Sequence, residues 1–500
     1  MKRMPFDRRG RTWDKKIGAI TVFLLSGILL HPSLLGAGEV DKLLTRAKLG
    51  EIKAQVRLGE HYFQGEGVPQ NYTEAYRWFA KAAERGNAEG QHRLGQMYAR
   101  GSGVLRDDAE AVRWYFLSAE QGYSEAQYDL GDMHMNGRGV LRNEVAAAKW
   151  FRKAAEQGHT EAQHKLGLMY ANRQGGLGND AEAAKWFRKA AERGHADAQR
   201  DLGVLYYTGH GVPRDYGEAM RWYRKAAEQG HADAQNKLGL MYHEGKGAPQ
   251  NYAEALKWLK KAATQENAAA QNNLGRIYAS GSGVVRDDAE AVRWFFMSAE
   301  QGYPGAQYGL GVMHEKGRGV PREDAKALHW YRKAAEQGYA AAQTNLGIMY
   351  FDGRGTPKNY GEAAKWLRKG AEQGDSAAQA NLGYLYRSGL GVSRDNTEAA
   401  KWYRKAAEQG NPEAQNSLGE LYERGAGVPR DYVESAKWYR KAVEQGFTEA
   451  QINLGSLYED GKGVPQDTVE ALRLYQRAAD KGSEVARDHY ERLELEYGGP

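Results

Sequence analysis

The residues best suited to chemistry in this chain are its histidines and its regularly spaced carboxylates. Thirteen histidines could ligate a metal, but no H-E-x-x-H pair occurs. His159, His195 and His231 each follow a glycine at one recurring position, which indicates a helix cap or a contact between helices rather than metal binding. Carboxylates such as Glu218 and Glu254 recur just as regularly, and we interpret them as residues that begin helices.

Glycine pairs raise phosphate binding as a second possible chemistry. Pairs such as Gly65/Gly67 and Gly461/Gly463 would need a preceding strand and the pattern G-x-x-x-x-G-K-[ST] or G-x-G-x-x-G, and neither pattern occurs. The serine-acylation motifs S-x-x-K and K-T-G are also missing. The absence of cysteine excludes disulfides and thiolate chemistry. We therefore expect a non-enzymatic protein with no catalytic residue, no metal site and no cofactor.

The charge distribution argues against a nucleic-acid partner. The formal net charge is +6, but residues 1–37 contain seven Lys or Arg and only two Asp. The remaining chain is nearly neutral, with 63 basic and 62 acidic residues. A nucleic-acid binder would carry a concentrated basic surface, so we expect no nucleic acid among the partners.

The N-terminal segment predicts export. A basic region precedes the apolar run IGAITVFLLSGILL (residues 17–30), and small residues follow near Ala37, which is the order of a secretory signal peptide. The run is short for a bilayer span of about 20 residues, but extending it through Leu34 and Leu35 leaves an uncleaved anchor open. Residues 1–37 are thus a signal peptide or an N-terminal membrane anchor. The remainder is expected to be periplasmic or secreted, or anchored in the inner membrane through residues 17–37 and facing the periplasm.

A repeat of 36 residues organises almost the whole remaining chain. The dipeptide Leu-Gly recurs at this spacing from Leu58 to Leu454, in twelve units without an insertion, and a Gln stands three residues before each Leu. A Trp stands twenty residues after each Leu in eleven units, and the twelfth has Leu474. The tryptophans predicted to form the structural core of the repeats are Trp78, Trp114, Trp150, Trp186, Trp222, Trp258, Trp294, Trp330, Trp366, Trp402 and Trp438.

Each unit reads as a helical hairpin. In residues 196–231, apolar side chains recur at helical spacing in two stretches. The intervening TGHGVPRD contains glycines that accept positive φ and a proline that cannot continue a helix. Gly203 and its equivalents lie inside the first helix, where glycine costs up to about 1 kcal/mol relative to alanine. We expect these glycines to allow close packing where the Trp of the second helix or a neighbouring helix crosses.

The unit A-x-x-x-L-G-x-x-Y-x-x-G-x-G-V-x-x-D-x-x-x-A-x-x-W-x-x-K-A-A-x-x-G resembles the Sel1-like repeat, a relative of the tetratricopeptide repeat, over about residues 50–482. The resemblance implies an all-α fold, an α/α superhelical solenoid of twelve hairpins, serving as an adaptor for protein complexes. We expect an N-terminal capping helix at 38–50, twelve repeats at 51–482, and a C-terminal capping helix and tail at 483–500. Two departures are Arg173, which replaces the first loop glycine of the fourth unit, and Glu266, which replaces a capping glycine in the sixth.

Partner-binding residues are expected at variable positions on this frame. In related repeats the first helices line the concave side, and here the positions one and two before each Leu-Gly are variable and polar. An asparagine amide both donates and accepts hydrogen bonds, which suits a peptide backbone or a glycan, although a solvated helix edge remains the simpler alternative. The candidate residues are Asn236, Asn272, Asn273, Asn345, Asn381, Asn416 and Asn453.

A second candidate surface follows the tryptophans of units two and seven. Most units continue with an aromatic residue and Arg-Lys, but these two read WYFLS and WFFMS. Phe116 and Leu117, and likewise Phe296 and Met297, either fill a groove between repeats or form an exposed apolar patch for a partner. The two stretches lie 180 residues apart, which is five units, and VPQNY at 68–72 matches APQNY at the same offset. This indicates that a five-unit block was copied.

These observations lead to two expected functions. The first is an exported, non-enzymatic scaffold or adaptor for protein partners in the bacterial cell envelope. The alternative is a binder of peptidoglycan or exopolysaccharide chains through the concave surface. An enzyme acting on peptidoglycan is disfavoured, because the sequence contains no nucleophile–base or metal constellation.

Overall fold

The computed structural model describes residues 32–497, which form helices and no strand. The chain divides between Asn179 and Asp180 into two compact units, which are described separately. The first unit contains α1 (Pro32–Lys48), α2 (Ile52–Gln64), α3 (Tyr72–Glu84), α4 (Ala88–Arg100), α5 (Asp108–Glu120), α6 (Ser124–Asn136), α7 (Glu144–Glu156), α8 (Thr160–Ala171) and the 3₁₀ helix η1 (Gln174–Gly176). The second unit contains α9 (Asp180–Glu192), α10 (Ala196–Thr208), α11 (Tyr216–Glu228), α12 (Ala232–Glu244), α13 (Tyr252–Thr264), α14 (Ala268–Ser280), α15 (Asp288–Glu300), α16 (Pro304–Lys316), α17 (Asp324–Glu336), α18 (Ala340–Asp352), α19 (Tyr360–Glu372), α20 (Ser376–Ser388), α21 (Asn396–Glu408), α22 (Pro412–Arg424), α23 (Tyr432–Glu444), α24 (Thr448–Asp460), α25 (Thr468–Ala479) and α26 (Glu484–Tyr497).

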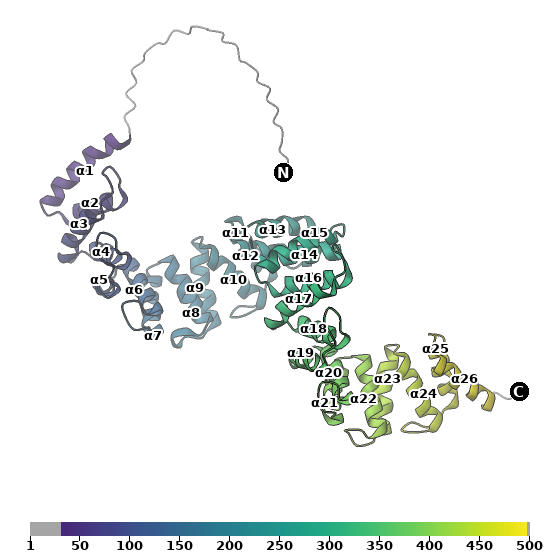
Figure 1. Ribbon diagram of the computed structural model, residues 1–500. Helices are drawn as coiled ribbons and strands as arrows, with labels where there is room; N and C mark the ends of the chain where they lie inside the picture. The colour runs from purple at the N-terminus through teal and green to yellow at the C-terminus, as the bar shows by residue number, and fades with distance from the viewer. Residues whose placement is uncertain (1–31, 498–500) are drawn as a thin grey trace, which may run out of the picture. The chain divides into compact units, whose positions relative to one another are not determined.

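Within each unit the helices stack as hairpins in chain order (Figure 1). The even-numbered helices α2 to α24 are the first helices of the repeats, and the odd-numbered helices α3 to α25 are the second helices. The predicted all-α solenoid of twelve helical hairpins is therefore confirmed. At the N-terminal end, α1 packs Val40, Leu43 and Ala47 against the first repeat. At the other end, α26 buries Ala486 and Leu493 and exposes most of its remaining side chains.

The N-terminal prediction falls largely outside the described residues. Residues 1–31 of the expected signal peptide or anchor are not described, and α1 begins at Pro32, within the segment 1–37. Among residues 32–497, every helix is too short or too polar to cross a bilayer.

Side-chain caps and left-handed residues set the ends of the helices. Asp215 Oδ1 accepts a hydrogen bond of 3.0 Å from the Glu218 N–H at the start of α11, and Gly209 ends α10 with φ 80°. Arg173 and Glu266 keep positive φ, 58° and 61°, although they carry side chains. The turn of the fourth repeat differs from that of the other repeats, since α8 ends one residue early and η1 follows.

Within each compact unit, the glycine of a Leu-Gly pair is the point where the two helices of a hairpin approach closely. A Cβ at Gly203 would lie 2.7 Å from the Tyr223 ring, and a Cβ at Gly311 would lie 2.4 Å from the Tyr331 ring. The prediction of close packing is confirmed, but Trp is the wrong crossing residue at these positions. The crossing side chain is the residue after the Trp, because the two neighbouring side chains on the second helix point in different directions.

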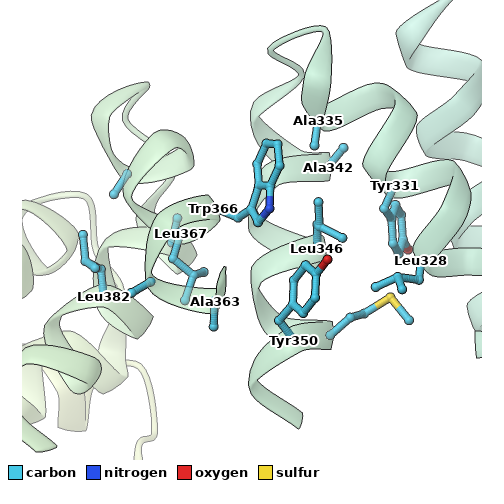
Figure 2. Packing of buried hydrophobic residues seen from close by; sticks show 14 of the residues in the cluster. Leu328, Tyr331, Ala335, Ala342, Leu346, Tyr350, Ala363, Trp366, Leu367 and Leu382 are labelled. Atoms are coloured by element: carbon cyan, nitrogen blue, oxygen red, sulfur yellow. The ribbon is translucent and has the colours of Figure 1, made fainter. Parts of the chain in front are cut away.

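The tryptophans instead join neighbouring repeats. Trp366 of α19 is 7% exposed and belongs to a cluster that includes Ala335 of α17 and Leu346 of α18. Figure 2 shows its indole ring beside these side chains. Trp366 thus fills the junction between the first helix of its own repeat and the second helix of the preceding repeat. Eight of the eleven tryptophans are buried, while Trp114, Trp150 and Trp402 are half-buried.

The repeated glutamines add a buried hydrogen-bond ladder at the same junctions. Gln343 Nε2 donates to the Ala335 carbonyl at the end of α17 (3.1 Å), and Gln343 Oε1 accepts from Gln373 Nε2 at the end of α19 (2.8 Å). The same two bonds recur at other repeats, for example at Gln235. One glutamine therefore ties three helices together and satisfies a carbonyl at a helix end.

The ladder is incomplete in the last repeat, which leads to a prediction. Neither amide atom of Gln451 has a hydrogen-bond partner in the described structure, and Lys481 occupies the position of Gln373. Lys481→Gln should supply the missing donor while keeping the existing bond to the Gly446 carbonyl. We expect a stabilisation of about 1 kcal/mol, measured as about fivefold slower amide hydrogen exchange in α24 and α25. Lys481→Ala is the control, and unchanged exchange in the Gln variant would contradict the ladder.

Candidate functional site

The exposed face of the second helices normally carries two cations after each Trp. In repeat nine, Lys369 Nζ lies 4.3 Å from the centre of the Trp366 ring. Arg368 lies over the ring of Tyr386 in the next repeat (5.9 Å) and donates to its hydroxyl (2.6 Å). The same Arg–Tyr pairing occurs in repeats of both compact units of the chain. These cations cover the aromatic rings that would otherwise face solvent.

Repeats two and seven lack both cations. Phe116 and Phe296 replace the Arg, and Leu117 and Met297 replace the Lys. The two phenylalanines are 47% and 50% exposed, and Leu117 and Met297 are each 38% exposed. The structure thus places these side chains in contact with solvent and not in a closed groove between repeats.

Each phenylalanine lies against the Trp of the following repeat. The centroid of the Phe116 ring is 6.2 Å from that of Trp150, edge-on, and the Phe296 ring is 6.5 Å from Trp330 in the same geometry. We name Phe116, Leu117 and Trp150 the first apolar patch. Phe296, Met297 and Trp330 form the second apolar patch.

A third change accompanies the two patches, and our sequence reasoning missed it. In other repeats, the Arg at this position bonds a Tyr that lies 18 residues later in the next repeat. That Tyr is replaced by His134 after the first patch and by His314 after the second patch. Burial lowers the pKa of both imidazoles, so both rings are neutral near pH 7. The Nδ1 atom of each has no hydrogen-bond partner among the described residues. His314 also lines a hollow of about 660 Å³ beside Phe296 and Met297, together with Arg293, Lys326 and His329.

The candidate asparagines serve mainly within the protein. Asn236, Asn272 and Asn416 are buried, at 5%, 5% and 6% exposed. Asn273 Nδ2 donates to Asn236 Oδ1 (2.9 Å), and Asn453 Nδ2 donates to Asn416 Oδ1 (2.9 Å). The residue two positions before the Leu-Gly pair of one repeat therefore contacts the residue one position before the Leu-Gly pair of the next repeat. These bonds hold the first helices of neighbouring repeats together.

The other two asparagines are half-buried. Asn381 Nδ2 donates to the Ala377 carbonyl of its own helix (2.9 Å). Burial raises the pKa of Tyr308 and of Tyr331, and the Asn345 side chain, which interacts with both hydroxyls, lowers each pKa by a smaller amount. A role of these residues in binding a partner stays a prediction.

The recurring histidines cap helices, as predicted. His159 Nδ1 accepts from the Ala162 N–H (3.1 Å), while its Nε2 donates to Glu125 (2.8 Å). His231 makes the same pair of bonds in its repeat, at 3.3 Å and 2.9 Å. His195 Nδ1 likewise accepts from the first turn of α10.

These elements define an α/α repeat protein with a regular frame and two local exceptions on its surface. A model of the Sel1 repeat matches twelve consecutive segments from residue 52 to residue 483. The chain therefore belongs to the Sel1 repeat family.

Known structures and proteins resemble this chain to different extents. The crystal structure of a protective antigen present in uropathogenic Escherichia coli strains, described as displaying an SLR fold, is 36% identical. The match covers 92% of this chain and 94% of that one, with a TM-score of 0.68. A Sel1 repeat protein from Oxalobacter formigenes is 35% identical over 62% of this chain and 89% of that chain, with a TM-score of 0.46. The secretory immunoglobulin A-binding protein EsiB of Escherichia coli is 39% identical over 66 residues, which span only 14% of its length and 13% of this chain.

Proposed function

We propose that this protein is an exported, non-enzymatic scaffold that binds protein partners through its two apolar patches. Sel1 repeat proteins typically serve as protein-interaction scaffolds, and the chain belongs to that family. The observation that carries the proposal is the replacement of Arg and Lys by exposed apolar residues at the same two positions of repeats two and seven.

The chemistry of the patches suits a protein interface. Phe, Met and Trp are enriched in the desolvated centres of interfaces, where a few large side chains supply most of the binding energy. Fully burying one such side chain contributes about 1.5–3 kcal/mol. Since Phe296 and Met297 are half-exposed in the free chain, a partner that covers them gains part of this energy without unfolding anything.

Export is supported by the order of basic, apolar and small residues in segment 1–37. The relatives point in the same direction, since one is described as a protective antigen and another is named for binding secretory immunoglobulin A. We therefore propose that the partner is met in the periplasm or outside the cell. The alternative is that this chain stays anchored in the inner membrane and faces the periplasm. N-terminal sequencing of the mature protein distinguishes cleavage from anchoring. The glycan alternative draws less support, because most of the candidate asparagines bond within the protein.

The test installs the cations that the other repeats carry. The double variants Phe116→Arg/Leu117→Lys and Phe296→Arg/Met297→Lys, alone and combined, should fold because sister repeats hold Arg-Lys at these positions. We expect unchanged thermal unfolding and, for the combined variant, at least about a tenfold loss of crosslinked protein partner. The measurement is crosslinking in the native envelope with quantitative mass spectrometry, and purified secretory immunoglobulin A is the first defined partner to titrate.

The matched control removes the cations from a repeat without a patch. Arg224→Ala/Lys225→Ala changes the equivalent positions of repeat five, whose Trp222 belongs to neither patch, and should leave partner recovery unchanged. Full partner recovery by the combined patch variant, or a loss explained by lower stability alone, would refute the role of the patches.

A further inference from the structure

A cavity of about 700 Å³ lies beside the first helices of repeats seven and eight. Its walls are aromatic, with Phe295 of α15, Tyr303 and Tyr308 at α16, and Tyr339 before α18. Its volume falls in the range of small-molecule sites, about 300–1,000 Å³. None of its lining residues lines the hollow beside the second apolar patch, so the two features are separate.

The copied block shows how this cavity arises. In repeats two and three, 180 residues earlier, His92 Nε2 donates to Asp129 Oδ2 across the first helices (2.8 Å). The equivalent of His92 is Asn272, and the equivalent of Asp129 is Gly309. The second side chain of the pair is therefore missing. The Phe295 ring lies 2.9 Å from where its Cβ would stand, and the cavity lies beside Gly309 and Phe295.

Asn272 is left with an unused hydrogen-bond acceptor. Other repeats pair this position with the next repeat, as Asn236 does with Asn273. Because the partner position of Asn272 is Gly309, which has no side chain, the Asn272 Oδ1 atom is buried without a hydrogen-bond partner among the described residues. Asn272 is 5% exposed and lines the cavity, so a ligand that carries a donor can satisfy it.

The charge of the lining has also changed. Three acidic residues of the earlier copy, Glu125, Asp129 and Asp132, correspond here to Gly305, Gly309 and Val312. Arg276 replaces Gln96, lines the cavity, is exposed and forms no ion pair within the described structure. The other cation in the lining, Arg318, is held by Asp288 at 2.6 Å. The cavity thus offers one free guanidinium, aromatic walls and no carboxylate.

We infer that this cavity binds an N-acylated aromatic amino acid with a free carboxylate. The carboxylate pairs with Arg276, since a guanidinium forms charge-assisted hydrogen bonds with it. The amide N–H of the ligand meets Asn272, and the ring packs among Phe295, Tyr303 and Tyr308. The same chemistry occurs in a free N-acyl amino acid and in the C-terminal residue of a peptide.

The experiment titrates the full chain by calorimetry with three probes. N-acetyl-phenylalanine represents the free ligand, acetyl-Gly-Gly-Phe represents the peptide terminus, and N-acetyl-phenylalaninamide lacks the carboxylate. We expect at least one acid to bind with a Kd below about 1 mM, and the amide to bind at least about tenfold more weakly. Tighter binding of acetyl-Gly-Gly-Phe than of N-acetyl-phenylalanine identifies peptide C-termini as the ligand. Equal affinity of the two acids shows that the terminal residue alone is recognised. Both results support the site.

Two variants restore residues of the earlier copy. Arg276→Gln, at an exposed position, should weaken binding of the acids about tenfold, and Gly309→Asp should abolish it by filling the cavity and adding a negative charge. Arg293→Gln, on the exposed face of α15 outside the cavity, is the control and should bind as the native chain does. If Gly309→Asp does not fold, Arg276→Gln still decides the question.

The inference is overturned if neither acid binds at about 1 mM, if acid and amide bind equally, or if Arg276→Gln binds as the native chain does. Each of these results leaves the proposed function untouched, because no patch residue lines this cavity.

Discussion

Replacing Trp366 by alanine is expected to lower the local free energy of unfolding of repeats eight and nine by about 3–5 kcal/mol. The indole ring fills the junction of α17, α18 and α19 beside Ala335 and Leu346, so its removal takes away these contacts and leaves a cavity. The loss includes the hydrogen bond from Trp366 Nε1 to Glu362 (3.1 Å). Because each repeat contacts only its neighbours, the effect should stay local.

Amide hydrogen exchange resolved by helix is the appropriate measurement, since an array of this length does not unfold in one cooperative step. Exchange should accelerate in α17 to α19 and stay unchanged in α24 and α25. The control is Lys369→Ala, which removes the cation over the same ring and should cost no more than about 1 kcal/mol. Equal effects of the two variants would show that the Trp is not an anchor of the junction.

Gly311→Ala is expected to destabilise repeat eight by about 2 kcal/mol, although alanine is the better helix former by about 1 kcal/mol. A Cβ at this position would lie 2.4 Å from the Tyr331 ring. The ring cannot move freely, because Tyr331 is buried and its hydroxyl donates to Glu315 Oε2 (2.6 Å). The two helices of the hairpin must therefore separate to admit one methyl group.

The matched control is Gly361→Ala, in the first turn of α19. The nearest atom to a Cβ there is Asn359 Oδ1 at 3.4 Å, and the position is exposed. This variant should stabilise the helix by up to about 1 kcal/mol. Hydrogen exchange in α16 and α17 checks the first substitution, and exchange in α19 checks the second. Stabilisation by both variants would contradict the close-packing role of Gly311.

The sequence predicted the frame well because one period of 36 residues dictates it. Leu-Gly, the following Trp and the caps all act within one repeat or between immediate neighbours, so their spacing is sufficient to place them. Spacing within one repeat does not show what faces what across repeats. For that reason the sequence predicts Asn273 and Asn236 as binding candidates, although stacking brings them together as a hydrogen-bonded pair.

The sequence predicts the two patches only in part, because spacing within one repeat does not show which residues face each other across repeats. Phe296 and Met297 stand out when the repeats are aligned on Trp. The matching change at His314 lies 18 residues later in the next helix, where other repeats carry Tyr. A search for coupled exceptions at fixed offsets between neighbouring repeats would have found it. The cavity beside Asn272 could not be predicted from the spacing of residues. It lies beside Gly309, which lacks the side chain that the earlier copy carries at this position.

The glutamine ladder has a consequence for how such a gene can grow. Most junctions between the described repeats offer the same donor and the same acceptor to the next repeat, so an inserted block can meet compatible neighbours at its ends. Unequal recombination can then lengthen the protein by whole repeats without any compensating mutation. Once two copies coexist, one can keep His92 and Asp129 while the other carries Asn272 and Gly309. A contact that one copy keeps can thus be lost in the other copy, where a pocket forms, while the glutamine hydrogen bonds still hold the neighbouring repeats together.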